Sequence, residues 1–324
     1  MVLLIAILGG LVFVYLRLTA PAVATGSSDV SPGFRHIKSI YAYGPGAENL
    51  FVEPFGVAYV DGRLYVGQQG KGNVIVLDAG GRYLRTIGTK GMAPGQLSSP
   101  GGLDVDRQGT VYVSDPSHGK LVVYGPDGRL VKELPVRYAL TPRVADGQNL
   151  YLTTFDSVNH YALPSFEQLS VWGGKRGRGA TEWDFPNGLA VADGGDAVYV
   201  ADSNNMRLKK LDRGGQTVWT VGQPPSGLKD QNRVFGLPGG MVLVDGVLYI
   251  ADPLNGVIHL YRTDGTKIGE VGEPGPGEGQ FSYPSQIAHL GGRRFAVTEW
   301  GNDRVQIVEI DPGGVQPGGT AVTQ

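Results

Sequence analysis

The chain has 324 residues, of which 41% are hydrophobic and 9% aromatic, and this is too apolar a composition for an intrinsically disordered protein. Glycine (52 residues) and proline (21 residues) are abundant, so we expect many short strands separated by turns. A formal net charge of -2 excludes a globally basic nucleic-acid-binding protein, and the absence of cysteine excludes disulfides, thiolate metal sites and a cysteine nucleophile.

The N-terminus begins with an uncharged apolar stretch, MVLLIAILGGLVFVYL, over residues 1–16. Two interpretations stay open for residues 1–24: a retained transmembrane anchor, or a signal peptide that is cut after the small-x-small sequence Ala22-Val23-Ala24. We expect the body to be exported to the extracytoplasmic side, as a membrane-tethered or a secreted protein, although Arg17 alone favours a cytoplasmic body. Residues 25–33 are expected to form a flexible linker.

The rest of the chain repeats one unit six times. Each unit opens at a proline, at spacings of 42 to 52 residues: Pro54, Pro100, Pro142, Pro186, Pro238 and Pro284. In the fourth unit the proline is followed by GLAVADG, VYVAD, RLKKLD and TVWTVG, which predict four short strands separated by turns. Four-stranded repeats of this length are typical of the blades of a β-propeller.

The last unit has no fourth strand of its own after Asp311. The N-terminal segment HIKSIYAYG (36–44) has the pattern of the fourth strands and precedes the first proline. We therefore predict an all-β, six-bladed propeller of four-stranded antiparallel blades over residues 34–311, closed by pairing of its N- and C-terminal strands. Residues 312–324 are expected to form a flexible tail.

Several motifs recur in the best-preserved units. They are the P-x-G-x-A and Y-V-A-D strands of the fourth unit, Asn205-Met206-Arg207-Leu208, Asn302-Asp303-Arg304-Val305, and the loops GTKGMAPGQLSSP (88–100) and GEPGPGEGQFSYP (272–284). With these motifs, the region from 34 to 311 resembles the NHL-repeat family of six-bladed β-propellers. The third unit departs most from the pattern, because its first strand is shortened and its second turn lacks the arginine.

Four of the six second strands end on an acid: Asp115, Asp202, Asp252 and Glu299. One interpretation is a ring of carboxylates around a metal or a cationic ligand. The other is that each carboxylate accepts N–H groups of its turn and pairs with a base of its own repeat, such as Arg207 or Arg304. Because most repeats share the feature, we favour the structural role.

One acid interrupts an otherwise apolar column. Alignment of the first strands from the proline places Asp104 opposite Ala58, Ala190, Val242 and Ala288, near the channel. A carboxylate there is costly unless it is paired, so Asp104 is a candidate ligand for a divalent metal such as calcium. The five histidines fall at unrelated repeat positions without the spacing of zinc ligands. We predict no other cofactor and no catalytic residue.

The loops between the fourth strand of one blade and the first strand of the next share one face of a propeller, here called the loop face, with the turns between second and third strands. Between the second and fifth blades these loops are rich in basic residues: Arg137, Arg143, Lys175, Arg176, Arg178, Lys229 and Arg233. The loops that flank the sixth blade carry only acids: Glu48, Glu53, Glu273 and Glu278. With Trp183 near the basic loops and Trp300 near the acidic ones, this pattern predicts a polarised surface that binds a protein or an anionic ligand.

Repeats without a catalytic constellation favour a membrane-tethered, extracytoplasmic propeller that acts as a protein- or ligand-binding scaffold. The alternative is a propeller metalloenzyme, lactonase-like or amidating-lyase-like, with a site in the central channel at Asp104. RNA binding is known for some NHL propellers but requires a cytoplasmic body, so nucleic acid is not expected as a partner.

Overall fold

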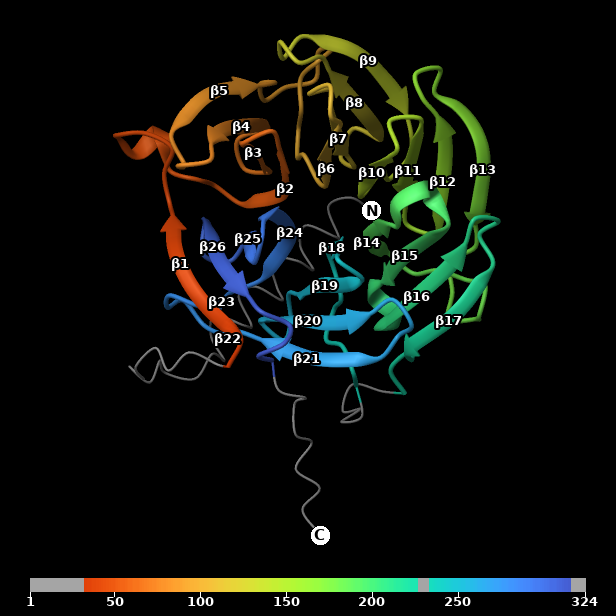
Figure 1. Ribbon diagram of the computed structural model, residues 1–324. Helices are drawn as coiled ribbons and strands as arrows, with labels where there is room; N and C mark the ends of the chain where they lie inside the picture. Colours follow the sequence, from red (N-terminus) through yellow and green to blue (C-terminus); the bar gives the residue numbers. More distant parts are fainter. Residues whose placement is uncertain (1–31, 227–232, 316–324) are drawn as a thin grey trace.

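The computed structural model describes residues 32–226 and 233–315, which form a six-bladed β-propeller viewed along its axis in Figure 1. The anchor or signal peptide predicted at 1–24 lies outside the described residues, as do most of the predicted linker and tail. Within the part of the chain that the structure describes, no helix is long and apolar enough to cross a membrane.

Five blades are built from four consecutive antiparallel strands, ordered from the channel outwards. Blades 1 and 2 are β2 (Pro54–Val60), β3 (Arg63–Gln68), β4 (Asn73–Asp78) and β5 (Tyr83–Ile87), then β6 (Leu103–Val105), β7 (Val111–Asp115), β8 (Lys120–Tyr124) and β9 (Leu130–Pro135). Blade 3 is β10 (Pro142–Ala145), β11 (Asn149–Thr153), β12 (Ser157–Ala162) and β13 (Glu167–Gly173). Blades 4 and 5 are β14 (Pro186–Val191), β15 (Ala197–Asp202), β16 (Arg207–Asp212) and β17 (Thr217–Gly222), then β18 (Met241–Val244), β19 (Val247–Asp252), β20 (Val257–Arg262) and β21 (Lys267–Val271).

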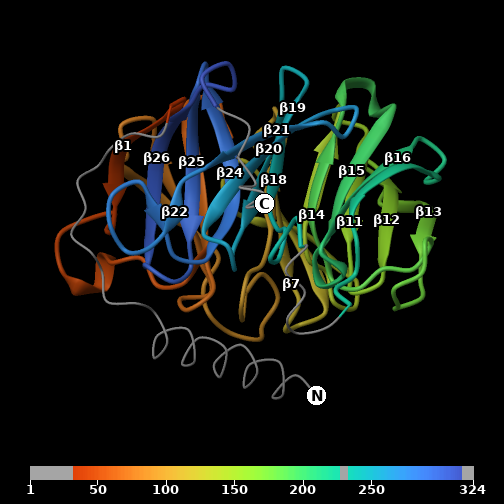
Figure 2. The ribbon, with the colours of Figure 1, turned by 90° about the horizontal axis from the view of Figure 1, so that it is seen from below.

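Blade 6 joins the two ends of the propeller. Its strands are β24 (Pro284–Gly291), β25 (Arg294–Glu299), β26 (Arg304–Ile310) and, as the outermost strand, β1 (Phe34–Ile40). β1 pairs antiparallel with β26 from Phe34 opposite Ile310 to Ile40 opposite Val305, and Figure 2 shows the two strands side by side. The predicted closure of the ring by the N- and C-terminal strands is confirmed.

Short accessory elements lie in the loops. They are the 3-10 helices η1 (Ala47–Asn49), η2 (Asp193–Gly195) and η3 (Ser203–Asn205), and the parallel pair β22 (Glu273–Pro274) and β23 (Gln280–Phe281). The first residues of the predicted tail are packed rather than loose, because Val315 is buried in the core between blades 5 and 6.

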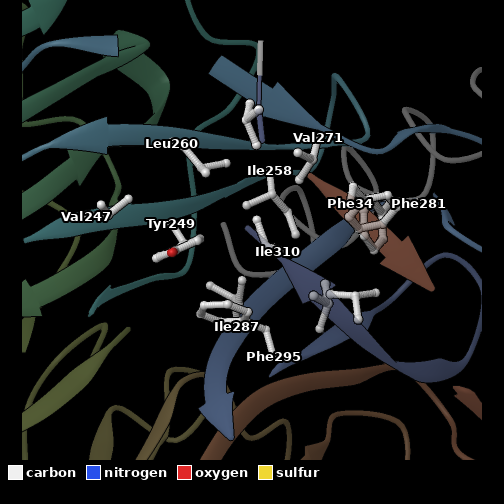
Figure 3. Close-up of a cluster of buried hydrophobic side chains, with 13 residues drawn as sticks. Phe34, Val247, Tyr249, Ile258, Leu260, Val271, Phe281, Ile287, Phe295 and Ile310 are labelled. Atoms are coloured by element: carbon white, nitrogen blue, oxygen red, sulfur yellow. The ribbon is translucent and has the colours of Figure 1, made fainter. Parts of the chain in front are cut away.

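The second strands are nearly continuous apolar runs because both faces of each blade pack against a neighbouring blade. Figure 3 shows one such layer, where Tyr249 and Ile258 of blade 5 lie with Ile287, Phe295 and Ile310 of blade 6. The rings of Tyr249 and Phe295 are 4.3 Å apart. Six such clusters, one between each pair of neighbouring blades, make the core a ring around the channel.

Hydroxyl groups also connect one blade to the next at the loop-face end of the inner strands. Ser114 Oγ donates to the carbonyl of Leu140 at 2.5 Å, from blade 2 to the start of blade 3. Equivalent bonds run from Thr141 to Asn187 (2.7 Å), from Ser203 to Pro238 (2.5 Å) and from Thr298 to Phe55 (2.5 Å). These bonds hold the inner strands, and with them the mouth of the channel, at a fixed spacing.

Candidate functional site

A charged pair lies within the column of first-strand residues that the sequence analysis expected to be apolar apart from Asp104. In blade 2 Asp104 lies opposite Tyr112, and in blade 3 Arg143 lies opposite Tyr151 in the same register position. Arg143 is therefore on strand β10 and not in a loop, so its predicted place on the loop face is wrong. The alignment from the proline failed here because this position comes four residues after the proline in the other blades, as in Asp104 after Pro100, but directly after Pro142 in blade 3.

The guanidinium of Arg143 crosses the channel. Its Nη1 lies 3.6 Å from Asp104 Oδ1 in blade 2, its Nε donates to the carbonyl of Leu189 in blade 4 at 3.0 Å, and its Nη2 donates to that of Met241 in blade 5 at 2.9 Å. The other oxygen of Asp104 accepts the backbone N–H of Val144 at 2.7 Å. One side chain of blade 3 thus links the inner strands of three other blades.

These contacts do not suit Asp104 as a metal ligand. Burial raises the pKa of Asp104, while the charge of Arg143 and the N–H of Val144 lower it. A cation next to the carboxylate repels a metal ion, and both carboxylate oxygens already have partners within the protein. Among the described residues, moreover, no three or more histidine, aspartate or glutamate side chains are placed to hold a metal. The pair acts as an internal brace of the channel.

The acids that end the second strands hold their blades together. Asp202 is fully buried and accepts the backbone N–H of Asp184 (2.7 Å), the amide of Asn205 (3.0 Å) and Nε of Arg207 (2.7 Å). Arg207 in turn donates to carbonyls of the preceding loop, including that of Glu182 at 2.7 Å. One carboxylate therefore connects the loop, the turn and the third strand of blade 4.

We call the acid at the end of a second strand, together with its partners, a node. In other blades the node is built from different side chains. Glu299 accepts from Arg304 and from Gln306, each at 2.6 Å. In blade 2 Lys120 stands at the position of this arginine, and His118 Nδ1 lies 3.0 Å from Asp115 Oδ2. Within these three blades the partner of the acid is therefore cationic, polar or a histidine, although the geometry of the node is retained.

In blade 5 a buried histidine takes the place of the arginine. His259 Nε2 lies 3.0 Å from Asp252 Oδ2, and its Nδ1 lies 3.2 Å from Oε2 of Glu270, which also pairs with Lys267 at 2.8 Å. Burial lowers the pKa of His259, but the two carboxylates outweigh this effect and raise it above its ordinary value. Contact with His259 lowers the pKa of Glu270 to about 2. The imidazolium form therefore suits this position.

The basic side of the loop face is partly neutralised by local ion pairs. Lys175 pairs with Glu182 at 2.5 Å, and Arg176 pairs with Asp184 at 3.0 Å. Arg178 is exposed and donates to the carbonyl of Pro225 at 3.4 Å. Arg233 is exposed as well, whereas Lys229 lies outside the described residues.

The two tryptophans differ in their surroundings. Trp183 is only 3% exposed and packs in the core between blades 3 and 4, so its expected role in surface binding is wrong. Its ring lies 4.0 Å below Nζ of the buried Lys209, whose pKa burial lowers to about 8. Trp300 is half-buried on the acidic side, and its ring lies 5.5 Å from that of Tyr283.

On the acidic side Glu48, Glu273 and Glu278 are exposed. Burial and the nearby carboxylate of Asp303 raise the pKa of Glu53. Two lysines that the sequence analysis did not count reach this side: Lys71 donates to the carbonyl of Leu50 at 2.6 Å, and Lys90 to that of Gly70 at 2.8 Å.

The structure brings together a row of half-buried rings that sequence reasoning missed. Tyr138 and Phe155 stack in parallel at 4.3 Å, Phe185 lies 5.3 Å from Phe155, and the guanidinium of Arg137 lies 4.7 Å from the ring of Tyr138. We call these four residues the aromatic row. It lies on the loop face at the start of the inner strands of blades 3 and 4, where the backbone turns left-handed at Tyr138 (φ 59°) and Phe185 (φ 56°). Bulky residues directly before the unit prolines, such as Phe185, were the available sequence signal.

Comparison with known proteins agrees with the architecture. Residues 46–168 match a family model described as a 6-bladed beta-propeller, and residues 184–211 match the model of the NHL repeat. The chain is a six-bladed β-propeller with an NHL repeat at residues 184–211. NHL repeat-containing protein 2 of Gallus gallus is 33% identical over 81 residues, which are 24% of this chain and 11% of that protein. The human protein of the same name is 27% identical over 90 residues, 27% of this chain and 12% of its own length. The matched segments thus span only about a tenth of the length of these curated relatives.

Solved structures show the same fold at low sequence identity. A streptogramin B lyase has a TM-score of 0.58 and 13% identity, with 86% of this chain and 98% of that chain covered. A structural genomics protein of unknown function from Bacteroides thetaiotaomicron has a TM-score of 0.64 and 16% identity, with 86% and 76% covered. A chain of a nidogen/laminin complex has a TM-score of 0.53 and 17% identity, with 67% and 79% covered. The fold therefore occurs in an enzyme and in a protein complex, and the site has to decide the function.

Proposed function

We propose that this NHL propeller is a membrane-tethered scaffold that holds a protein partner on its loop face, on the extracytoplasmic side of a membrane. The observation that carries the proposal is the crossing of the channel by Arg143, which binds Asp104, Leu189 and Met241 on three other blades. At this level of the channel the guanidinium already has its partners within the protein. A ligand is therefore better placed on the loop face than in the channel.

The loop face offers the groups that protein interfaces use. Exposed arginines and half-buried aromatic rings are enriched at the centres of such interfaces, and the aromatic row provides both. Exposed acids around blades 1 and 6 give the face its second charged side. A partner whose charges match both sides would be oriented as it binds.

Site-specific photocrosslinking in cells tests the binding face. A photoreactive phenylalanine analogue replaces Tyr138 on the loop face or, as the matched control, Arg129, which is 89% exposed in a turn on the opposite face. We expect a discrete protein adduct from position 138 and none from position 129. Equal adducts from both faces, or an adduct from position 129 alone, would contradict the proposal.

Membrane tethering rests on the apolar sequence of residues 1–24, which lie outside the described residues. We expect the full chain in the membrane fraction and a chain without residues 2–24 in the supernatant after ultracentrifugation. A protease that cannot cross the cytoplasmic membrane, added outside that membrane, should digest the propeller. Protection until the membrane is dissolved would show a cytoplasmic body and overturn the predicted orientation.

A further inference from the structure

The aromatic row is built on a backbone conformation that bulky residues avoid. Tyr138 and Phe185 both have left-handed φ angles, and Phe185 directly precedes Pro186, which further disfavours a helical conformation. Glycine adopts this conformation without a steric penalty, and the chain places glycine at many other left-handed positions. At these two positions the large ring is therefore present for its contacts and not for the backbone.

The rings contact one another, but each keeps part of its surface in solvent. Tyr138, Phe155 and Phe185 are all half-buried, and none belongs to the buried clusters between the blades. The parallel stack at 4.3 Å holds the rings in a fixed row across three loops. Because the rings are already ordered, the stacking of a further flat side chain on the aromatic row costs little additional conformational entropy of these rings.

Cationic groups lie on the same face as the row. Among the described residues, no carboxylate lies within ion-pair distance of Arg137 or Arg178. Arg176 is 64% exposed and pairs with Asp184, the residue directly before Phe185. Carboxylates are the groups that arginines in this setting recognise, through charge-assisted hydrogen bonds.

The acidic side of the same face selects between two kinds of anionic partner. Glu48, Glu273 and Glu278 are exposed there, and Glu278 is 73% exposed. A nucleic acid carries negative charge along its whole length and would be repelled as it crosses the mouth of the channel. A protein segment with acids at one end and neutral or basic residues at the other matches both sides.

We propose that the aromatic row is the docking platform for an acidic segment of a partner protein, which stacks an aromatic side chain on Phe185 and Tyr138 while its carboxylates pair with Arg137, Arg176 and Arg178. This inference rests on the proposed binding function and names the chemistry of the partner. The recognised sequence combines at least one aromatic residue with neighbouring aspartates or glutamates.

Selection from a displayed library of random peptides on the immobilised full chain tests the proposal. We expect enrichment of peptides that combine acids with an aromatic residue, and binding of a synthetic copy that weakens about tenfold or more in Phe185→Gly and in Arg137→Gln. Two matched controls should bind as the wild type does. Tyr283→Gly changes a pre-proline residue with the same left-handed backbone (φ 54°) on the acidic side, and Arg129→Gln removes an arginine of the opposite face. Thermal unfolding of each variant confirms that it is folded.

The outcomes separate the inference from the function on which it rests. Enriched peptides that bind Phe185→Gly and Arg137→Gln with unchanged affinity would overturn the platform and leave a binding function elsewhere on the propeller. No enrichment over an unrelated immobilised protein would overturn both. Displacement of the peptide by oligothymidine at comparable concentration would show that the platform prefers a nucleic acid, which also overturns the inference.

Discussion

Replacement of Arg143 by methionine should destabilise the propeller by about 3–4 kcal/mol. The guanidinium donates to the carbonyls of Leu189 and Met241, and a hydrogen bond from a charged donor contributes roughly 1.5–3 kcal/mol. The side chains of Arg143 and Asp104 are 14% and 16% exposed, so residual solvent screens the pair and the lower end of that range applies. Methionine fills similar space but leaves two carbonyls and one carboxylate without their partner.

Thermal unfolding of the full chain measures this loss. We expect a fall in Tm of roughly 6–16 °C, because a domain of this size loses about 2–4 °C for each kcal/mol. The double variant Asp104→Ala with Arg143→Met should lose less than the sum of the two single variants, since the first change removes the carboxylate that the second leaves unpaired. An Arg143→Met chain within about 1 kcal/mol of the wild type would refute the role of the brace.

The pH dependence of the same variant adds a second check with a defined sign. Burial raises the pKa of Asp104, so the folded state binds this proton more readily than the unfolded chain, and the cost of the buried charge is greatest at neutral pH. As the pH falls towards the carboxyl range, Asp104 takes up a proton and no longer needs the guanidinium. The stability gap between Arg143→Met and the wild type should therefore narrow on acidification. A gap that widens would contradict the assignment.

Three further predictions concern the nodes that hold the blades. The pKa of His259 is raised in the fold, so the stability that its charged form contributes is fully present below its unfolded pKa of about 6.5 and is lost as the pH rises through the folded value. His259→Gln should therefore cost about 1–3 kcal/mol in urea unfolding at acidic pH and less at alkaline pH. A cost independent of pH would count against an imidazolium at this site. Ser114→Ala and Thr298→Val each remove a hydrogen bond between blades and should lower the free energy of unfolding by about 1–2 kcal/mol. The control Ser117→Ala, at an exposed turn residue, should lower it by less than about 0.5 kcal/mol. Equal losses in all three variants would show that these hydroxyl groups do not hold the blades together. Gly188→Ala places a methyl group 1.9 Å from the carbonyl oxygen of Gly239 in the next blade, so the inner strands must separate. We expect a loss of stability on the order of 3 kcal/mol or more in the same unfolding assay. A neutral effect would show that blades 4 and 5 do not pack this closely.

Much of the fold was predictable because its signals are local. Each unit carries its own proline, its own glycine turns and its own apolar strands, and these features determine strand formation within a few residues. Closure was also predictable, because the last unit lacks a fourth strand and HIKSIYAYG precedes the first unit with the missing pattern. A repeat allows one blade to be checked against another, so errors in single strands did not change the architecture.

The site depends on contacts between blades, which the pattern of one blade does not contain. Whether Arg143 lies in a loop or in the channel depends on where the shortened β10 begins, and only the pairing of Arg143 with Tyr151 shows that it lies in the strand. The sequence placed Trp183 on the surface, whereas in the structure its ring is buried and lies against Nζ of Lys209.

The sequence by itself determined a closed, six-bladed β-propeller, because each unit carries its own strand and turn signals and the first segment supplies the strand that the last unit lacks. Only the tertiary structure decided which side chains meet: Arg143 with three other blades, His259 between two acids, and Tyr138 with Phe155 and Phe185. These residues are far apart in sequence or come from different loops, and packing of the blades around the channel brings them within a few ångströms of one another.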